Sequence, residues 1–285
     1  MSGAGENEMK THPMEKYFRN GINYTTCPGC GNGIVTQSIL RAIDSIGDSI
    51  DCYAFVSGIG CSGWIPSPAF NADLLHVTHG RSMPVATGLK VALPGQRVIV
   101  CQGDGDMSAI GGNHFIHSCR RNVDITVICV NNSIYGMTGG QTAPTTPLDL
   151  VTATSPYGNI ERNFDLSSVA IAAGATFVAR WTTWHPRQLA MSIKKAILHP
   201  GFALVEVISQ CPIQYGKAVG MRNNAPAMLQ EYKEKSIMAN SPKLTELSAE
   251  ERADRIIVGE LACKESEREF TAELERLRRE AAKNG

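Results

Sequence analysis

Short apolar runs alternate along this chain with segments whose apolar residues recur at helical spacing. The runs are rich in valine and isoleucine and end at glycine or at polar residues, which predicts buried strands. We expect strands at residues 52–57, 97–102, 124–130, 176–180 and 202–208. We expect helices at residues 31–46, 83–93, 107–121, 167–174 and 186–198. Apolar strands that alternate with helices are typical of a mostly parallel sheet covered by helices on both faces, so the predicted fold class is α/β.

The remaining segments suggest how the chain is divided. Residues 132–165 form a long stretch rich in glycine, threonine and proline, and a loop of that length is usually functional or disordered. From about residue 241 the sequence is strongly charged with sparse apolar residues, which predicts helix that is either solvated or in contact with a partner subunit. We therefore expect a polar leader at 1–20, one main domain at 21–220 and a largely helical C-terminal extension at 221–285.

Composition narrows the class of protein. Lys and Arg together equal Asp and Glu at 27 each, so no net field attracts nucleic acid or an anionic membrane. The first 20 residues contain no apolar run of the kind found in a signal peptide, and no stretch approaches the roughly 20 apolar residues of a spanning helix. We expect a cytoplasmic protein with neither a nucleic-acid nor a membrane partner.

Two short motifs follow neighbouring predicted strands. Gly103-Asp104-Gly105 comes after the strand at 97–102, and Asn131-Asn132 comes after the next one. Parallel sheets bind their ligands beyond the carboxyl ends of the strands. A divalent ion that bridges two phosphates needs hard oxygen ligands, which Asp104, Asn132 and the carbonyl of Ile134 can supply. A lone Gly-Asp-Gly is usually a turn, but the two motifs together predict a metal–diphosphate site.

The nine cysteines have uneven spacing, which argues against a disulfide framework. Cys52, Cys101 and Cys129 stand in apolar runs and are predicted to be core thiols. Four others are better placed for ligation: Cys27 and Cys30 share a tight turn, and Cys61 and Cys211 follow strand ends. By spacing alone, zinc, a redox disulfide and an iron–sulfur cluster all stay open for them. Combined with the diphosphate motifs, they suggest a redox enzyme in which an organic cofactor passes electrons to iron and sulfur.

Several strings resemble known proteins. The pair Gly103-Asp104-Gly105 and Asn131-Asn132 resembles the thiamine diphosphate motif of thiamine-dependent enzymes. Over about residues 17–220 the chain is similar to the β subunits of 2-oxoacid:ferredoxin oxidoreductases, and most of all to the 2-oxoglutarate type. The strings that carry the likeness are CPGCG (27–31), GIGCS (58–62), HGRSMPVATG (79–88), GDGD (103–106), NNSIYGMTGGQ (131–141) and CPIQYG (211–216).

The resemblance implies roles for individual residues. Asp104, Asn132 and the Ile134 carbonyl would hold Mg²⁺ on thiamine diphosphate, and Met137 would lie under the bent cofactor. One [4Fe–4S] cluster would be bound by Cys27, Cys30, Cys61 and Cys211. Further cofactor contacts are implied for Gly60, Cys61, Ser62, His79, Gly103, Gly105, Thr138 and Gly139. His79 and Trp64 are candidates for the substrate pocket, and no residue of this chain is expected to act as acid or base.

The resemblance also implies a reaction and partners. The enzyme would oxidatively decarboxylate a 2-oxoacid, foremost 2-oxoglutarate, to acyl-CoA and CO₂, with ferredoxin as electron acceptor, and would be reversible toward CO₂ fixation. A larger α subunit with pyrimidine-binding and transketolase-C-like domains would supply the activating glutamate, in an α₂β₂ assembly. Some relatives have a lysine near position 64, so here the charge that neutralises the distal carboxylate of 2-oxoglutarate would come from the α subunit. Alternatives are a pyruvate or broad-specificity enzyme, a cluster-free thiamine diphosphate decarboxylase subunit, and a zinc-stapled scaffold.

Overall fold

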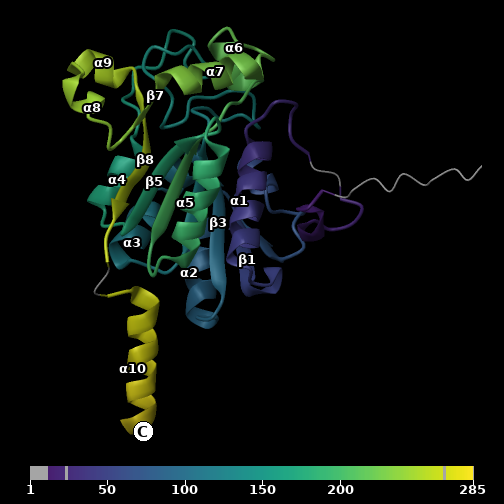
Figure 1. The fold of residues 1–285 in the computed structure, drawn as a ribbon, viewed down its shortest axis with the longest axis vertical. Coiled ribbons are helices and arrows are strands. Elements are labelled where there is room, and N and C mark those ends of the chain that lie inside the picture. Colours follow the sequence, from purple (N-terminus) through teal and green to yellow (C-terminus); the bar gives the residue numbers. More distant parts are fainter. Residues whose placement is uncertain (1–11, 23–24, 266–267, 285) are drawn as a thin grey trace, which may run out of the picture.

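A twisted sheet with helices on both faces forms the body of the molecule (Figure 1). The computed structural model describes residues 12–22, 25–265 and 268–284. Within them the strand order is β2-β1-β3-β4-β6-β5-β8-β7, and strands β1 to β6 all run parallel to one another. The strands are β1 (Tyr53–Ser57), β2 (Asp73–His76), β3 (Arg97–Gly103), β4 (Thr126–Asn131), β5 (Phe177–Thr182), β6 (Ala203–Ile208), β7 (Ser236–Met238) and β8 (Ile256–Cys263). The predicted α/β class with a mostly parallel sheet is confirmed.

The central strands are apolar because both of their faces are covered. In β3, Val98 and Val100 face one hydrophobic core, whereas Ile99 and Cys101 face the other. One core contains α1 (Asn32–Ile46) and α5 (Pro186–Leu198). The second core is formed by α2 (Ser82–Ala92), α3 (Gly112–Arg121) and α4 (Leu166–Ala172). Burial on both sides explains why these strands read as continuous apolar runs instead of alternating ones.

The C-terminal part differs in one segment from the prediction of a largely helical extension. It contains α7 (Ala225–Lys235), the short α8 (Lys243–Glu246) and α9 (Ala249–Ala253), and α10 (Phe270–Asn284), which projects below the sheet in Figure 1. However, β8 lies between α9 and α10 and pairs antiparallel with β5. The short β7, which follows α7, pairs parallel with β8. The prediction of helix was therefore wrong for Ile256–Cys263. Its β-branched start, Ile256-Ile257-Val258, favours a strand, and the buried Val258 joins the core.

Three smaller differences from the predicted elements are found elsewhere in the chain. Strand β2 was not predicted, since it is a mostly exposed edge strand without an apolar run. Cys52 is exposed, because it ends a 3₁₀ turn (Ile50–Cys52) before β1, whereas Cys101 and Cys129 are buried as predicted. A π-helical turn, Asp106–Ile110, precedes α3.

The first 11 residues of the predicted leader lie outside the described residues. Beyond them, Glu15–Tyr17 forms a 3₁₀ turn, and Met14 and Tyr17 are buried in the core. In the part of the chain that the structure describes, we find no helix with the length and apolar character needed to cross a membrane.

The carboxyl edge of the sheet gathers the predicted motifs. Gly103 at the end of β3 is paired with Val130 of β4, and Asn131 is paired with Ile208 of β6. The segment 132–165 that follows β4 contains no helix or strand, in agreement with the prediction. Its own side chains fix it: the Nδ2 amide of Asn159 donates to the carbonyls of Thr146 and Pro147.

Candidate functional site

A cavity of about 270 Å³ opens at the carboxyl edge of the sheet, beyond β1, β3 and β4. All of the predicted cofactor contacts except Gly139 line it. The lining residues are Ile59, Gly60, Cys61, Ser62, His79, Gly103, Asp104, Gly105, Asp106, Val130, Asn132, Ile134, Tyr135, Gly136, Met137 and Thr138. Gly139 lines a neighbouring hollow that shares Ile134. Trp64 does not line the cavity; its half-exposed ring lies 6.2 Å from that of His76, centroid to centroid.

Asp104 is the main buried charge of this cavity. Its side chain follows β3 and is 2% exposed, and the hydroxyl of Thr145 donates to its Oδ2. Backbone N–H groups of Gly105 and Ser133 donate to the same carboxylate, but burial outweighs them and raises the pKa of Asp104 to about 6. Ionisation of a buried carboxyl group costs free energy when the group is alone, but it becomes favourable when a cation binds beside it.

The Asn131-Asn132 turn is held in a defined shape by side-chain hydrogen bonds. Asn131 Oδ1 accepts from the backbone N–H of Ser133 at 3.1 Å, and Asn132 Oδ1 accepts from that of Ile134 at 3.2 Å. Ser133 has φ of +60°, a conformation that non-glycine residues adopt rarely. Asn132 and Ile134 both line the cavity, together with Asp104.

Glu206, which the sequence analysis did not single out, fixes this turn from below. It is 1% exposed on β6, and its Oε1 accepts from Asn131 Nδ2 at 2.8 Å. Its Oε2 accepts from Ser167 Oγ at 2.6 Å and from Arg180 Nε at 2.8 Å. A single charged residue within an apolar strand must be paired when it is buried, and that rule is the signal that could have identified Glu206.

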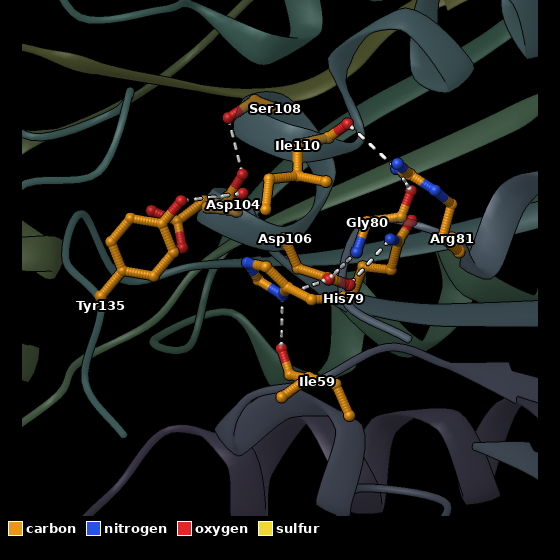
Figure 2. Close-up of polar contacts among 11 residues, drawn as sticks. Ile59, His79, Gly80, Arg81, Asp104, Asp106, Ser108, Ile110 and Tyr135 are labelled. Carbon is orange, nitrogen blue, oxygen red and sulfur yellow. Dashed lines mark hydrogen bonds and ion pairs between the residues drawn. The ribbon is translucent and has the colours of Figure 1, made fainter. Parts of the chain in front are cut away.

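Asp106 and His79 form a second polar pair in the cavity (Figure 2). Asp106 Oδ1 lies 2.6 Å from His79 Nδ1 and also accepts from the backbone N–H of Gly80 at 2.6 Å. Gln102 Nε2 donates to the other carboxylate oxygen at 2.8 Å. Because His79 Nδ1 faces a carboxylate, it carries a proton, and Nε2 is left as the ring nitrogen available to a ligand. The sequence string GDGD contained Asp106, but its histidine partner is brought to it only by the fold.

Tyr135 shapes the wall on the other side of Asp104 (Figure 2). Its hydroxyl donates to the carbonyl of Gly105 at 3.2 Å, and its ring lies 6.1 Å from that of His79, centroid to centroid. A Cβ at position 105 would stand 2.4 Å from the Tyr135 ring. Glycine is therefore required at position 105 by this close contact.

The four predicted cluster cysteines come from three loops at the same edge. A Cβ at Gly136 would lie 3.5 Å from the sulfur of Cys211 and 4.0 Å from that of Cys61, so these two thiols lie close to each other and to the cavity. Burial, with a smaller contribution from the nearby thiols of Cys211, Cys61 and Cys27, raises the pKa of Cys30 to about 12. Among the described residues, no three or more His, Cys, Asp or Glu side chains are arranged to hold a metal ion.

Comparison with known proteins agrees with this geometry. Residues 58–207 match the family described as thiamine pyrophosphate enzyme, C-terminal TPP binding domain. The chain is 52% identical to the 2-oxoglutarate synthase subunit KorB of Methanocaldococcus jannaschii over 267 residues, which are 93% of this chain and 97% of that protein. It is 49% identical to the KorB subunit of Methanothermobacter marburgensis over 89% of this chain and 88% of that one.

A solved structure is similar over nearly the whole chain. The 2-oxoglutarate:ferredoxin oxidoreductase from Magnetococcus marinus, with 2-oxoglutarate, coenzyme A and succinyl-CoA bound, aligns with a TM-score of 0.83 and 30% identity. The alignment covers 97% of this chain and 93% of that one. On these matches, which span the sheet, the cavity and the cysteine loops, the chain belongs to the family of 2-oxoglutarate synthase KorB subunits, the β subunits of 2-oxoacid:ferredoxin oxidoreductases.

Proposed function

We propose that this chain binds thiamine diphosphate through Mg²⁺ and carries one [4Fe–4S] cluster, in an enzyme that converts 2-oxoglutarate and coenzyme A to succinyl-CoA and CO₂ with ferredoxin as electron acceptor. The observation that carries the proposal is the meeting of Asp104 and Asn132 at one cavity from two adjacent strand ends. The names of its relatives and of the Magnetococcus structure support the choice of 2-oxoglutarate over pyruvate.

The residues at the cavity fit a magnesium diphosphate. Asp104 offers a carboxylate whose pKa is raised by burial, and Asn132 and Ile134 offer an amide and a carbonyl oxygen. All three are hard oxygen donors of the kind that Mg²⁺ prefers. Thr138 at the rim, followed by Gly139, can supply a hydroxyl and backbone N–H groups to phosphate oxygens. When bound there, thiamine diphosphate supplies the carbon nucleophile and the electron sink for decarboxylation.

The chain's own side chains orient the ligand. Asp106 holds the Nδ1 proton of His79 and leaves Nε2 to donate to or accept from a substrate carboxylate or carbonyl. Met137 lines the cavity and is 47% exposed, which suits an apolar support that another molecule covers. Tyr135, packed on Gly105, also lines the cavity.

The loops that carry the four predicted cluster cysteines fit an iron–sulfur cluster better than a single metal ion. Four irons and four sulfides form a body much larger than one ion, so their cysteine ligands stand further apart than the ligands of zinc. The described cysteines form no single-ion site, although Cys61 and Cys211 flank Gly136 and the Cys27–Cys30 turn lies near them. Cys61 also lines the cavity, so a cluster held there would lie close to the thiamine.

The proposal requires a partner. The acidic residues in the cavity lining are Asp104 and Asp106, and both are engaged, so the glutamate that activates the aminopyrimidine would come from a larger α subunit. Ile59 and Met137 at the rim are 42% and 47% exposed, as expected of a surface that such a subunit covers. We infer an α₂β₂ assembly in the cytoplasm.

The test is a composition measurement on anaerobically purified protein co-expressed with its α subunit. About four irons, four sulfides and one thiamine diphosphate per β chain, with 2-oxoglutarate-dependent and CoA-dependent reduction of methyl viologen, would support the proposal. Thiamine diphosphate without iron would indicate a decarboxylase subunit that has no redox function. Zinc without thiamine would overturn the proposal. Faster viologen reduction with pyruvate would reassign the substrate alone.

A further inference from the structure

The turn that carries two of the four cluster cysteines lies at the surface of the molecule. Cys27, Pro28 and Gly29 are all exposed, whereas Cys30 is half-buried. The turn sits on the start of α7, since a Cβ at Gly29 would lie 2.6 Å from that of Ala225. Gln210 Nε2 donates to the carbonyl of Gly29 at 3.1 Å, which fixes the turn from the sheet side. Cys27 is thus the predicted cluster ligand with the shortest path to solvent.

An exposed tryptophan stands on the other side of this turn. Thr183 lies against Gly31, with its methyl group 3.0 Å from where a Cβ of Gly31 would be. The next residue, Trp184, is 41% exposed, and Lys233 of α7 holds its ammonium 5.2 Å from the ring centroid. Tryptophan is enriched among the residues that contribute most to binding at protein interfaces, and here it stands beside a cation.

Cations without acidic partners surround the turn. Arg222 lies in the segment just before α7, Lys233 lies on α7, and Arg187 lines a groove with Gly33 and Ile34 of the first turn of α1. All three are exposed, and in the described chain none of them makes an ion pair. On α7, Glu231 pairs with Lys235, whereas Glu234 accepts from the neutral amide of Gln230 and keeps its charge, so the three cations outnumber it. The chain as a whole is neutral, so the positive charge here is local.

We propose that the Cys27 surface, formed by residues 27–29, Trp184, Arg187, Arg222 and Lys233, is the docking site for an acidic one-electron carrier of the ferredoxin class. The inference rests on the proposed function. Oxidation of one 2-oxoacid with coenzyme A releases CO₂, one proton and two electrons, so two oxidised carriers are each reduced by one electron. A basic rim steers an acidic carrier to this surface, and the exposed turn lets it approach the cluster ligands closely.

The test is charge reversal in the α–β holoenzyme. We expect Arg222→Glu with Lys233→Glu to raise the KM for an acidic ferredoxin roughly tenfold at low salt, with the difference shrinking at high ionic strength. The rate with methyl viologen, which needs no docking surface, should stay at the wild-type value. Lys264→Glu, at the opposite end of the sheet after β8, is the matched control and should change neither rate.

Each other outcome has a defined meaning. An unchanged ferredoxin KM in the double variant, with normal iron and thiamine content, would overturn the docking site. Loss of the α subunit on purification would show that this surface binds α instead, which also overturns it. If the double variant fails to fold, Arg222→Gln with Lys233→Gln should still weaken the salt dependence of the ferredoxin rate. Absence of viologen reduction in the wild-type enzyme would contradict the proposed function itself.

Discussion

The buried carboxylate of Asp104 predicts that one substitution will stabilise the protein and abolish its cofactor binding. Burial raises the pKa of Asp104 from 3.8 to about 6. Between these values the folded chain binds more protons than the unfolded chain, so the free energy of unfolding without cofactor falls as pH rises from about 4 to about 6. At 1.36 kcal/mol per unit, the charge costs about 3 kcal/mol at neutral pH and above.

Asp104→Asn removes this charge and keeps the shape of the side chain. The amide oxygen can still accept from Thr145, although the amide nitrogen cannot accept from the backbone N–H groups of Gly105 and Ser133. We therefore expect the cofactor-free variant to gain at most about 3 kcal/mol at pH 8 and only about 1 kcal/mol at pH 4.5, where the carboxyl of the folded chain is still mostly protonated. The variant should also lose Mg²⁺-dependent binding of thiamine diphosphate, because its anionic ligand is gone.

The assay compares thermal unfolding of cofactor-stripped protein at pH 4.5 and pH 8 with calorimetric titration of thiamine diphosphate, with and without Mg²⁺. Asp165→Asn is a control of opposite sign, since the Arg180 guanidinium lowers the pKa of Asp165 and neutralising it should destabilise the protein at pH 8. If Asp104→Asn gave the same stability change at both pH values, the reasoning from burial would be refuted. Retained Mg²⁺-dependent binding would refute the role as metal ligand.

Three further substitutions test other parts of the site. Cys211→Ala should lose iron but keep thiamine diphosphate, and an unchanged iron content by elemental analysis would place the fourth ligand elsewhere. Gly105→Ala should cost about 1–3 kcal/mol in urea unfolding, because its methyl group would overlap the Tyr135 ring, and Tyr135→Leu in the same chain should restore part of the loss. Glu206→Gln leaves Arg180 partly unpaired in the interior and should cost about 3–5 kcal/mol, with weaker thiamine diphosphate binding through the Asn131 turn; full binding affinity would contradict that coupling.

The sequence was sufficient for the elements that are buried on both faces. Strands such as β3 and β4 are apolar throughout, and the residues that follow them are polar and small, so both the sheet and its active edge could be predicted. Gly103-Asp104-Gly105 and Asn131-Asn132 are informative because a parallel sheet brings successive strand ends to one side.

The features that could not be predicted from the sequence depend on contacts between residues that are distant along the chain. The charged neighbours of Ile256–Cys263 masked a strand whose pairing with β5 spans about 80 residues. His79 and Asp106 are joined only because Gly80 and the π-helical turn after Asp104 meet above the sheet. Glu206 looked like an interruption of an apolar strand, and only its three donors show why a charge is tolerated there.

The position of β8 far along the sequence has a consequence for folding during synthesis of the chain. β8 covers an edge of β5, yet it lies more than 70 residues after it, so on the ribosome that edge stays open until β8 has also emerged. At 5–20 residues per second this lasts roughly 4–15 s, during which an uncovered strand edge can pair with another nascent chain. A chain that terminates before Ile256 should therefore accumulate as aggregate, because it lacks the strand that covers this edge of β5.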